Sequence, residues 1–301
     1  MWHHLVSQWI RSQATEHARE AVFRAAQGAP GAGTAPHAEA GDEPPAGPPP
    51  PCDVGLVFAL GIEAGGTLDL LEGVVKIRGH EFVAYEGAIA GRRVVLIEAG
   101  PGREKAARAT EALIDGHQPA WVISAGFAGG LVDGLARNDL FVPNSVAWQD
   151  SSADPPRDER LAIDVKMPPA PHLHIGRLLT VDAVVRTADD KRGLASAHEA
   201  QAVDMETFAI AAACQARKTR FFSVRVISDE VGDELPPEIE HLLHQETLSG
   251  RLGAAAGSIF RRPSSIKDLW KLKETALVAS DRLGKFLAEL VGQLAPREPR
   301  E

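Results

Sequence analysis

The sequence predicts an α/β domain built around a largely parallel or mixed sheet. Short apolar runs rich in β-branched residues alternate with longer segments whose apolar residues recur at helical spacing. The first run, residues 54–60 (VGLVFAL), is bounded by Pro-rich sequence and by Gly61, as expected of a strand. No internal repeat occurs at solenoid spacing. Alternation of this kind is typical of strands joined by helices that cover a sheet.

The expected elements follow in chain order. Strands are expected over residues 54–60, 82–85, 93–98, 121–124, 139–143, 178–185 and 220–228. Helices are expected over residues 104–116, 206–217, 237–245 and 269–294. The last helix has one apolar face at helical spacing, formed by Leu283, Phe286, Leu287, Leu290, Val291 and Leu294.

The chain divides into four parts by composition. Residues 1–28 could form an amphipathic helix, although a poorly ordered extension is the preferred interpretation. Residues 29–52 are rich in Pro, Gly and Ala and have few large apolar residues, so a linker is expected there. The folded domain is expected over residues 53–295, followed by a short tail at 296–301.

Charge and cysteine content narrow the partners and the compartment. The formal net charge is -9, with 41 Asp and Glu against 32 Lys and Arg, so nucleic acid is not expected as a partner. The two cysteines, Cys52 and Cys214, do not form a disulfide framework and fit a reducing compartment. We find no apolar run long enough to span a bilayer and no signal-peptide pattern. The cytoplasm is the expected location.

Several familiar motifs are missing. Two glycine-rich segments follow expected strands, residues 99–102 (AGPG) and 124–130 (SAGFAGG), and are expected as turns at a shared crevice. Neither has the spacing of a dinucleotide or nucleoside-triphosphate loop. The histidine pairs 172/174 and 241/244 lack further ligands at a recognisable spacing, so no metal is expected. The serine-hydrolase elbow G-x-S-x-G is also missing.

Asp229 is the first candidate for chemistry. It ends the apolar strand at 220–228, in the sequence FFSVRVISDEVGDELPP. A carboxylate at the end of a buried parallel strand lies where open α/β sheets bind their ligands. Partial desolvation there can make it a proton donor. The alternative is that Asp229 caps a following turn or helix.

Three separated segments together suggest a family. They are VGLVFALGIE ending at Glu63, WVISAGFAGGL at 121–131, and AVDMETFAIA at 202–211 followed by VRVISD at 224–229. This set resembles the purine nucleoside phosphorylase/nucleosidase superfamily, and most closely its 5′-methylthioadenosine/S-adenosylhomocysteine nucleosidase branch. The segment SIFRRPSSIKDLWKLK resembles hopanoid-associated members. The resemblance implies a single three-layer α/β/α domain with a central mixed sheet.

The resemblance also implies roles for individual residues. Cleavage of the N-glycosidic bond of an adenosine derivative requires an acid at the base, a carboxylate near the incoming water and groups that hold the ribose. By resemblance, Asp229 protonates purine N7, and Glu63 orients and deprotonates water. Met205 packs on the ribose and Glu206 binds its hydroxyls. Further substrate-binding positions implied in this way are Phe127, Gly129, Val184, Val185 and Ser228.

Each of these residues also has a plain structural interpretation. Glu63 could be a carboxylate that favours a helix start, Met205 a core filler and Glu206 an N-terminal helix residue. The family commonly has Ser where this chain has Phe127, and often an aromatic residue where it has Val184. Stacking on the base must then come from elsewhere, such as Phe127 or Phe208. A bulky apolar 5′ substituent, as in adenosylhopane, fits these departures.

Hydrolysis is preferred over phosphorolysis. Arg103 and Arg225 could contribute to an anion pocket, but the phosphate loop of family phosphorylases is missing after the first strand and Glu63 would repel phosphate. Nucleoside phosphorylase, adenosylhopane-type nucleosidase and non-catalytic nucleoside-binding or storage protein are the alternatives. A small-molecule nucleoside and water are the expected partners, with phosphate instead of water in a phosphorylase. No cofactor is expected, and the family implies a homodimer.

Overall fold

The computed structural model describes residues 50–79, 81–150, 157–165, 167, 170–236, 239 and 264–294. The expected N-terminal helix at 1–28, most of the linker and the tail at 296–301 lie outside these residues. The same holds for the expected helix at 237–245, apart from residue 239.

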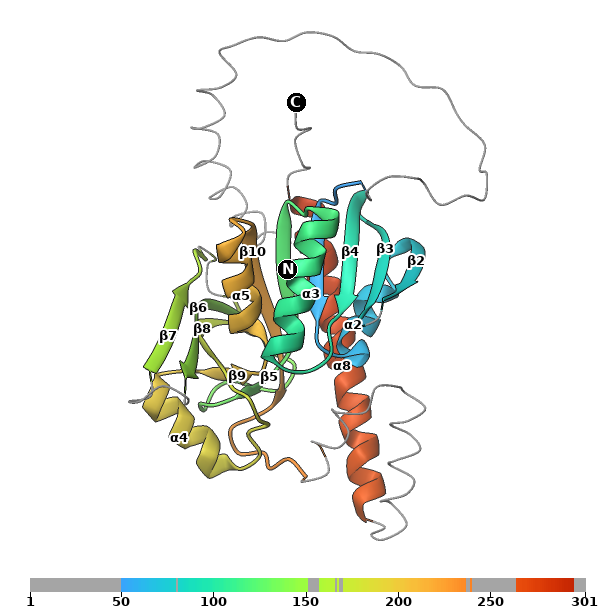
Figure 1. Ribbon diagram of the computed structural model, residues 1–301. Coiled ribbons are helices and arrows are strands. Elements are labelled where there is room, and N and C mark those ends of the chain that lie inside the picture. Colours follow the sequence, from blue (N-terminus) through green and yellow to red (C-terminus); the bar gives the residue numbers. More distant parts are fainter. Residues whose placement is uncertain are drawn as a thin grey trace, which may run out of the picture.

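Ten strands form one mixed sheet (Figure 1). They are β1 (Val54–Phe58), β2 (Glu72–Arg78), β3 (Val83–Ile89), β4 (Arg92–Glu98), β5 (Trp121–Gly130), β6 (Leu140–Asp150), β7 (Arg157–Ala162), β8 (Leu173–Thr180), β9 (Ala202–Asp204) and β10 (Arg220–Asp229). Their order is β10-β6-β8-β9-β5-β1-β4-β3-β2, with β7 paired to β6 and β10 also paired to β5. Strands β4, β1, β5 and β10 are parallel neighbours, so their carboxyl ends share one edge.

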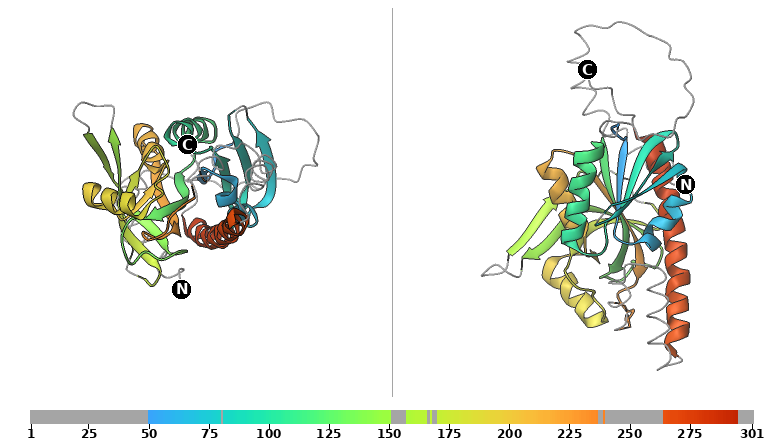
Figure 2. Two further views of the ribbon diagram at one scale, coloured as in Figure 1. Left: turned by 90° about the horizontal axis from the view of Figure 1, so that it is seen from below. Right: turned by 45° about the vertical axis from the view of Figure 1, so that its right-hand side comes forward.

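Helices cover both faces of this sheet. They are α2 (Gly61–Leu68), α3 (Arg103–His117), α4 (Ala188–His198), α5 (Thr207–Ala216) and α8 (Ser264–Gln293). Figure 2 shows α3 and α8 on opposite sides of the central strands. Alternate residues of β1 divide between these sides, since Leu56 packs in one core cluster with Leu283, and Val57 in another with Leu113. The expected three-layer α/β/α architecture with a mixed sheet is therefore confirmed.

Helices α2 and α8 cross at two glycines. A Cβ atom at Gly66 would overlap the backbone of Ser280, and one at Gly284 would overlap the backbone of Gly66. The Ser280 hydroxyl accepts a hydrogen bond from the Gly66 amide at 2.8 Å and donates one to the Glu63 carbonyl oxygen at 3.1 Å. Helix α8 thus fixes the position of α2, including the turn that carries Glu63.

Two sequence predictions about strands are wrong. The expected strand at 178–185 ends at Thr180. There the amide of Val181 donates a hydrogen bond to the carbonyl oxygen of Asp204, which is the last residue of the three-residue strand β9. The glycine-rich segment 124–130 is not a turn but the second half of β5. It pairs with β10 on one side and at its end with β9. Glycine within a strand often marks the close approach of another group.

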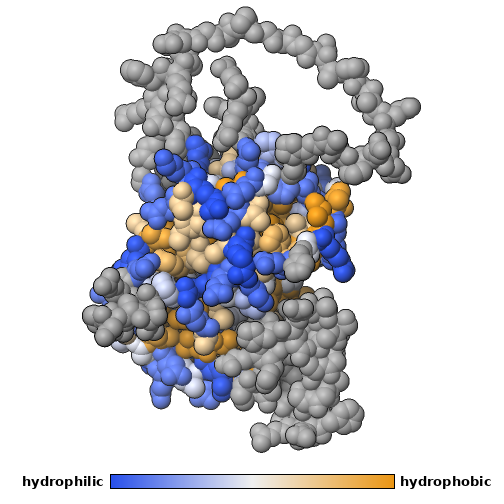
Figure 3. All heavy atoms as spheres, viewed as in Figure 1, coloured by the Kyte–Doolittle hydropathy of each residue, from blue (hydrophilic) through white to orange (hydrophobic). Residues whose placement is uncertain are grey.

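The edge strand β2 has every residue exposed. Figure 3 shows orange apolar residues at this edge of the molecule. The exposed large apolar side chains here are Leu70, Val74, Val75 and Ile77. No helix in the described ranges is long and apolar enough to cross a membrane.

Candidate active site

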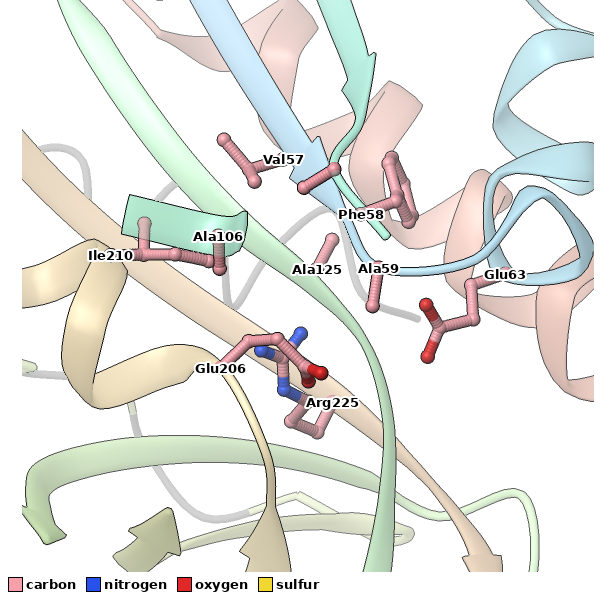
Figure 4. Close-up of a pocket in the computed structure, with 10 residues that line it drawn as sticks. Val57, Phe58, Ala59, Glu63, Ala106, Ala125, Glu206, Ile210 and Arg225 are labelled. Carbon is pink, nitrogen blue, oxygen red and sulfur yellow. The ribbon is translucent and has the colours of Figure 1, made fainter. Parts of the chain in front are cut away.

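A small pocket lies at the carboxyl edge of the parallel strands. Its walls come from the end of β1, the starts of α2, α3 and α5, and strands β5 and β10. Figure 4 shows the Glu63 and Glu206 carboxylates directed into the space between these elements, with the Arg225 guanidinium beside Glu206. The lining residues are Val57, Phe58, Ala59, Glu63, Ala99, Ala106, Ala125, Glu206, Ile210 and Arg225.

Glu63 is held by two backbone amides. Its Oε2 accepts a hydrogen bond from Leu60 at 2.9 Å, and its Oε1 accepts one from Phe127 on β5 at 2.8 Å. The first bond satisfies an amide at the start of α2, so the helix-start interpretation is correct as well. Burial raises the pKa of Glu63 above its usual 4.5, although the Phe127 amide and Arg225 act against this shift. A carboxylate with a raised pKa is suited to accept a proton near neutral pH.

Glu206 lies at the N-terminus of α5, and its Oε1 accepts a hydrogen bond from the Gly102 amide at 2.7 Å. Gly102 has φ +99°, a conformation that favours glycine and turns its amide towards the pocket. Burial, followed by the charges of Asp204 and Glu63, raises the pKa of Glu206 to about 8. At neutral pH this side chain is therefore largely protonated and can donate a hydrogen bond to a ligand.

Arg225 forms a buried ion pair beneath the pocket. Its Nε and Nη2 donate to Asp204 Oδ2 at 3.1 and 2.8 Å, and Nη2 also donates to Ser124 Oγ at 2.7 Å. Asp204 receives further hydrogen bonds from the hydroxyl of Thr180 at 2.8 Å and the amide of Thr207 at 3.0 Å. This network joins β5, β8, α5 and β10. The positive charge of Arg225 also lowers the pKa values of Glu63 and Glu206, which burial raises.

Asp229 ends β10 and is 6% exposed. Its Oδ1 accepts a hydrogen bond from the Ser228 hydroxyl at 2.6 Å. Its Oδ2 lies 2.6 Å from Nζ of Lys191, a helix α4 residue that sequence analysis missed. A turn at residues 231–232 rather than a helix follows Asp229, and the side chain of Asp229 accepts its hydrogen bond from Ser228 rather than from this turn.

Strand β5 lies close to Glu63 at one glycine and to Asp229 at another. A Cβ atom at Gly126 would lie 2.8 Å from Glu63 Oε1, and one at Gly129 would lie 3.1 Å from Asp229 Oδ2. Both carboxylates thus rest against positions of β5 that lack a side chain. Asp229 is not among the residues that line the pocket, and positions three apart on a regular strand face opposite sides of the sheet.

The remaining sequence-predicted residues are not among those that line the pocket. Met205, Val184 and Val185 are half-buried, and Val185 packs on a core cluster that contains Val203. Phe127 is half-buried in contact with the main core, and its amide rather than its ring holds Glu63. These residues come from β5, the loop after β8 and the β9–α5 connection.

Phe208, suggested as a stacking residue, is in the core. It is 6% exposed, and its ring lies 5.9 Å from the Trp148 ring at 40°. Trp148 is itself covered by the guanidinium of Arg103, 3.8 Å from its ring centroid. Arg103 also pairs with Asp182 at 2.6 Å, so it joins the start of α3 to the loop after β8.

The histidines at 172 and 174 are bound to one carboxylate. Nδ1 of His172 lies 2.8 Å from Asp139 Oδ1, and Nε2 of His174 lies 2.8 Å from Asp139 Oδ2. The described residues contain no group of three or more His, Cys, Asp or Glu side chains arranged to hold a metal ion. The second pair, 241 and 244, lies outside the described ranges.

Lys191 could have been found from the sequence. Thr187 and Asp190 mark a helix start, and the Thr187 hydroxyl accepts the Asp190 amide at 3.1 Å. Lysine in the first turn of a helix is disfavoured by the helix dipole, which places positive charge there. A lysine at this position therefore indicates a nearby anionic partner.

These features define a class: an α/β protein with a carboxylate-lined pocket at the carboxyl edge of a mixed sheet. The family model of the phosphorylase superfamily matches residues 53–258. The chain belongs to this superfamily of nucleoside N-glycosidases and phosphorylases, as the sequence resemblance indicated.

Relatives within the superfamily are similar at low identity. The 5′-methylthioadenosine/S-adenosylhomocysteine nucleosidase of Actinobacillus succinogenes is 27% identical over 209 residues, which are 63% of this chain and 91% of the relative. The nucleosidase of the same name from Staphylococcus haemolyticus is 25% identical over 222 residues, 65% of this chain and 94% of the relative.

Solved structures share the fold. The nucleosidase of the same name from Neisseria meningitidis, in complex with methylthio-immucillin-A, gives a TM-score of 0.62 at 23% identity, covering 80% of this chain and 99% of that one. Futalosine hydrolase of Helicobacter pylori gives a TM-score of 0.61 at 19% identity, and the match covers 81% of this chain and 98% of that one.

Proposed function

We propose that the protein hydrolyses the N-glycosidic bond of a 5′-substituted adenosine and releases adenine and the 5′-substituted ribose. The observation that carries the proposal is the placement of Glu63 and Asp229 against the same strand at Gly126 and Gly129. The reaction needs a base at the attacking water and an acid at the departing purine. Glu63 lines the pocket and Asp229 lies at the end of the neighbouring strand β10, so each carboxyl group is assigned one of these two tasks.

In this proposal each carboxylate has one task. Asp229 transfers a proton to purine N7 while the bond between C1′ and N9 breaks and its electron pair moves to the base. Glu63 removes a proton from the water that attacks C1′. Each proton transfer contributes about 10²–10⁴-fold to the rate. Glu206 and Met205 hold the ribose, and protonated Glu206 can donate a hydrogen bond to a hydroxyl or accept one from it.

Two observations favour water over phosphate as the nucleophile. The Glu63 carboxylate lies in the pocket, which opposes the entry of an anion. The two arginines considered for an anion site are engaged with carboxylates, Arg225 with Asp204 and Arg103 with Asp182.

The substrate class is proposed from the relatives. Two of them are named for methylthioadenosine and adenosylhomocysteine, and the fold also occurs in futalosine hydrolase. Val184 instead of an aromatic residue, and Phe127 instead of serine, distinguish this chain from the family pattern. A larger apolar 5′ substituent, as in adenosylhopane, is therefore included among the candidates.

A substrate panel with and without phosphate tests the proposal. Purified protein is incubated with methylthioadenosine, adenosylhomocysteine, deoxyadenosine and 5′-adenosyl compounds with apolar substituents, and free base is measured by chromatography. We expect adenine and a reducing sugar in phosphate-free buffer. An absolute requirement for phosphate would instead identify a phosphorylase. Release of no base from any compound would leave a nucleoside-binding protein.

A further inference from the structure

Lys191 is a fully buried lysine, 0% exposed, in the first turn of α4. Lysine is almost never fully buried unless it is paired, because removal of an ammonium group from water is strongly unfavourable. Its place in the first turn adds to this penalty through the helix dipole. A residue kept under these conditions requires a strong local partner.

Three oxygen atoms surround the ammonium group. Nζ donates hydrogen bonds to the carbonyl oxygens of Glu230 at 2.7 Å and Asp233 at 3.0 Å, and it contacts Asp229 Oδ2 at 2.6 Å. The two carbonyls explain how Lys191 anchors the loop that follows β10. They do not explain the third contact, which is to the proposed acid of the reaction.

Other charged groups around this loop are already paired. Arg137 binds Asp233 at 2.8 Å, and the Asp233 carboxylate also accepts the Glu230 amide at 2.6 Å. The Glu230 carboxylate accepts the Arg137 amide at 3.2 Å. On α4, Asp190 is engaged with the Thr187 hydroxyl at 2.6 Å. Asp229 is therefore the carboxylate in closest contact with the Lys191 ammonium.

The three oxygen atoms around Nζ are compatible with one proton on either the lysine nitrogen or the Asp229 carboxyl group. An ammonium has three N–H donors, and three oxygens surround it. A neutral amine has two N–H donors, which the two carbonyls satisfy, and a lone pair that faces a protonated Asp229. The 2.6 Å contact with Asp229 Oδ2 is an ion pair without hydrogen-bond geometry, so this oxygen still has room to accept a proton from Nζ while the two carbonyl oxygens of the loop keep their donors.

We propose that Lys191 is a positioning residue that acts through Asp229 and supplies the proton delivered to the departing purine. The proposal rests on the proposed hydrolysis. As C1′–N9 breaks, one N–H bond of the Lys191 ammonium breaks and an O–H bond forms on the Asp229 carboxylate. That O–H bond breaks as N7–H forms, which leaves Lys191 as a neutral amine and Asp229 as a carboxylate. Water gives its hydroxide to C1′ and its proton to Glu63, and exchange with solvent returns a proton to Lys191.

The pH dependence of kcat in Lys191→Met tests this inference. A lone carboxyl group ordinarily loses its proton near pH ~4, whereas an ammonium does so near pH ~10. We therefore expect the descending limb of the profile to move to lower pH in the variant, with at least a ~10²-fold loss at pH 8 and partial recovery at pH 5.5. An unchanged limb, or a move to higher pH, would overturn the proposal. Recovery at acid pH also shows that the variant is folded.

A second variant separates proton supply from charge. Lys191→Arg keeps a positive charge, but a guanidinium does not give up its proton in proteins. Activity at pH 8 should therefore be lost in this variant too, and wild-type activity would overturn the proposal even if Lys191→Met does not fold. Lys285→Met, at an exposed ion pair on α8, is the matched control and should retain the wild-type profile. If the wild-type protein releases no base, the proposed function is wrong. If the wild-type protein is active and both Lys191 variants behave like it, only the role proposed for Lys191 is rejected.

Discussion

Glu206 accepts a hydrogen bond from the amide of Gly102, 104 residues earlier in the chain, at 2.7 Å. This contact joins the start of α5 to the start of α3 and fixes one wall of the pocket. It places a carboxyl group among other carboxylates away from water, and burial is the main reason that its pKa rises to about 8. A buried carboxyl group of this kind reduces the stability of the folded protein, and this loss of stability can be measured.

Glu206→Gln should stabilise the protein at pH 8 but not at pH 5. The folded state holds the Glu206 proton up to about pH 8, whereas the unfolded chain releases it near 4.5. The stability contributed by this proton is thus complete below pH 4.5 and is lost as pH rises towards 8. Urea unfolding at both pH values measures the difference between wild type and variant. The exposed Glu199→Gln serves as control, and a gain of equal size at pH 5 and 8 would contradict the prediction.

Asp229→Asn should abolish base release while adenine binding persists. The amide keeps the shape of the side chain but cannot donate the proton, so kcat should fall by about 10²–10⁴-fold. Base release by chromatography and adenine binding by calorimetry give the two measurements. Asp115→Asn, on the exposed side of α3, should behave as wild type. Activity within threefold of wild type in Asp229→Asn would exclude Asp229 as the acid.

Arg225→Met should destabilise the fold strongly. Removal of the guanidinium leaves Asp204 as a buried carboxylate without its ion-pair partner, which costs about 3–5 kcal/mol. Arg217→Met is the matched control, because Arg217 pairs with Glu111 and Asp115 at a solvent-accessible position. Loss of such a pair changes stability by about 0–1 kcal/mol. Equal effects of the two substitutions in denaturant unfolding would refute the central role of the buried pair.

Gly126→Ala should reduce catalysis more than stability. The new methyl group would lie 2.8 Å from Glu63 Oε1 and 3.0 Å from Arg225 Nη1, so the carboxylate must move. Misplacement of a reacting group by about 1 Å can reduce the rate about 10²-fold. The control is Gly116→Ala on α3, where nothing lies within 4 Å of the added atom. That substitution should stabilise the helix by up to about 1 kcal/mol, and kcat should not change.

The outline of the fold could be predicted from sequence because its central strands are buried on both faces. Residues 54–60 form a continuous apolar run, residues 220–228 are rich in large apolar and β-branched residues, and the structure places strands β1 and β10 there. Strand β2 was missed because it is an exposed edge whose residues do not alternate clearly. Strand β9 has three residues and depends on pairing with β5 and β8, which no local pattern shows.

The sequence predicted part of the site, because local sequence patterns show where strands end and helices start. Glu63, Glu206 and Asp229 lie at such positions. Ser280 acts across the fold on partners that are distant in sequence. Lys191 has a local signal in its place near a helix start, but its partner Asp229 lies on another element. The glycine segment 124–130 was taken for a turn because sequence alone does not show that the carboxylates of Glu63 and Asp229 occupy the space its side chains would fill.

The contact between Ser280 and Glu63 spans 217 positions of the chain. Among the described residues, Glu63 belongs to the first strand–helix unit, whereas α8 is the last helix and leaves the ribosome much later. The group proposed to activate water is therefore held in its final position only after α8 has been made, at a late stage of synthesis.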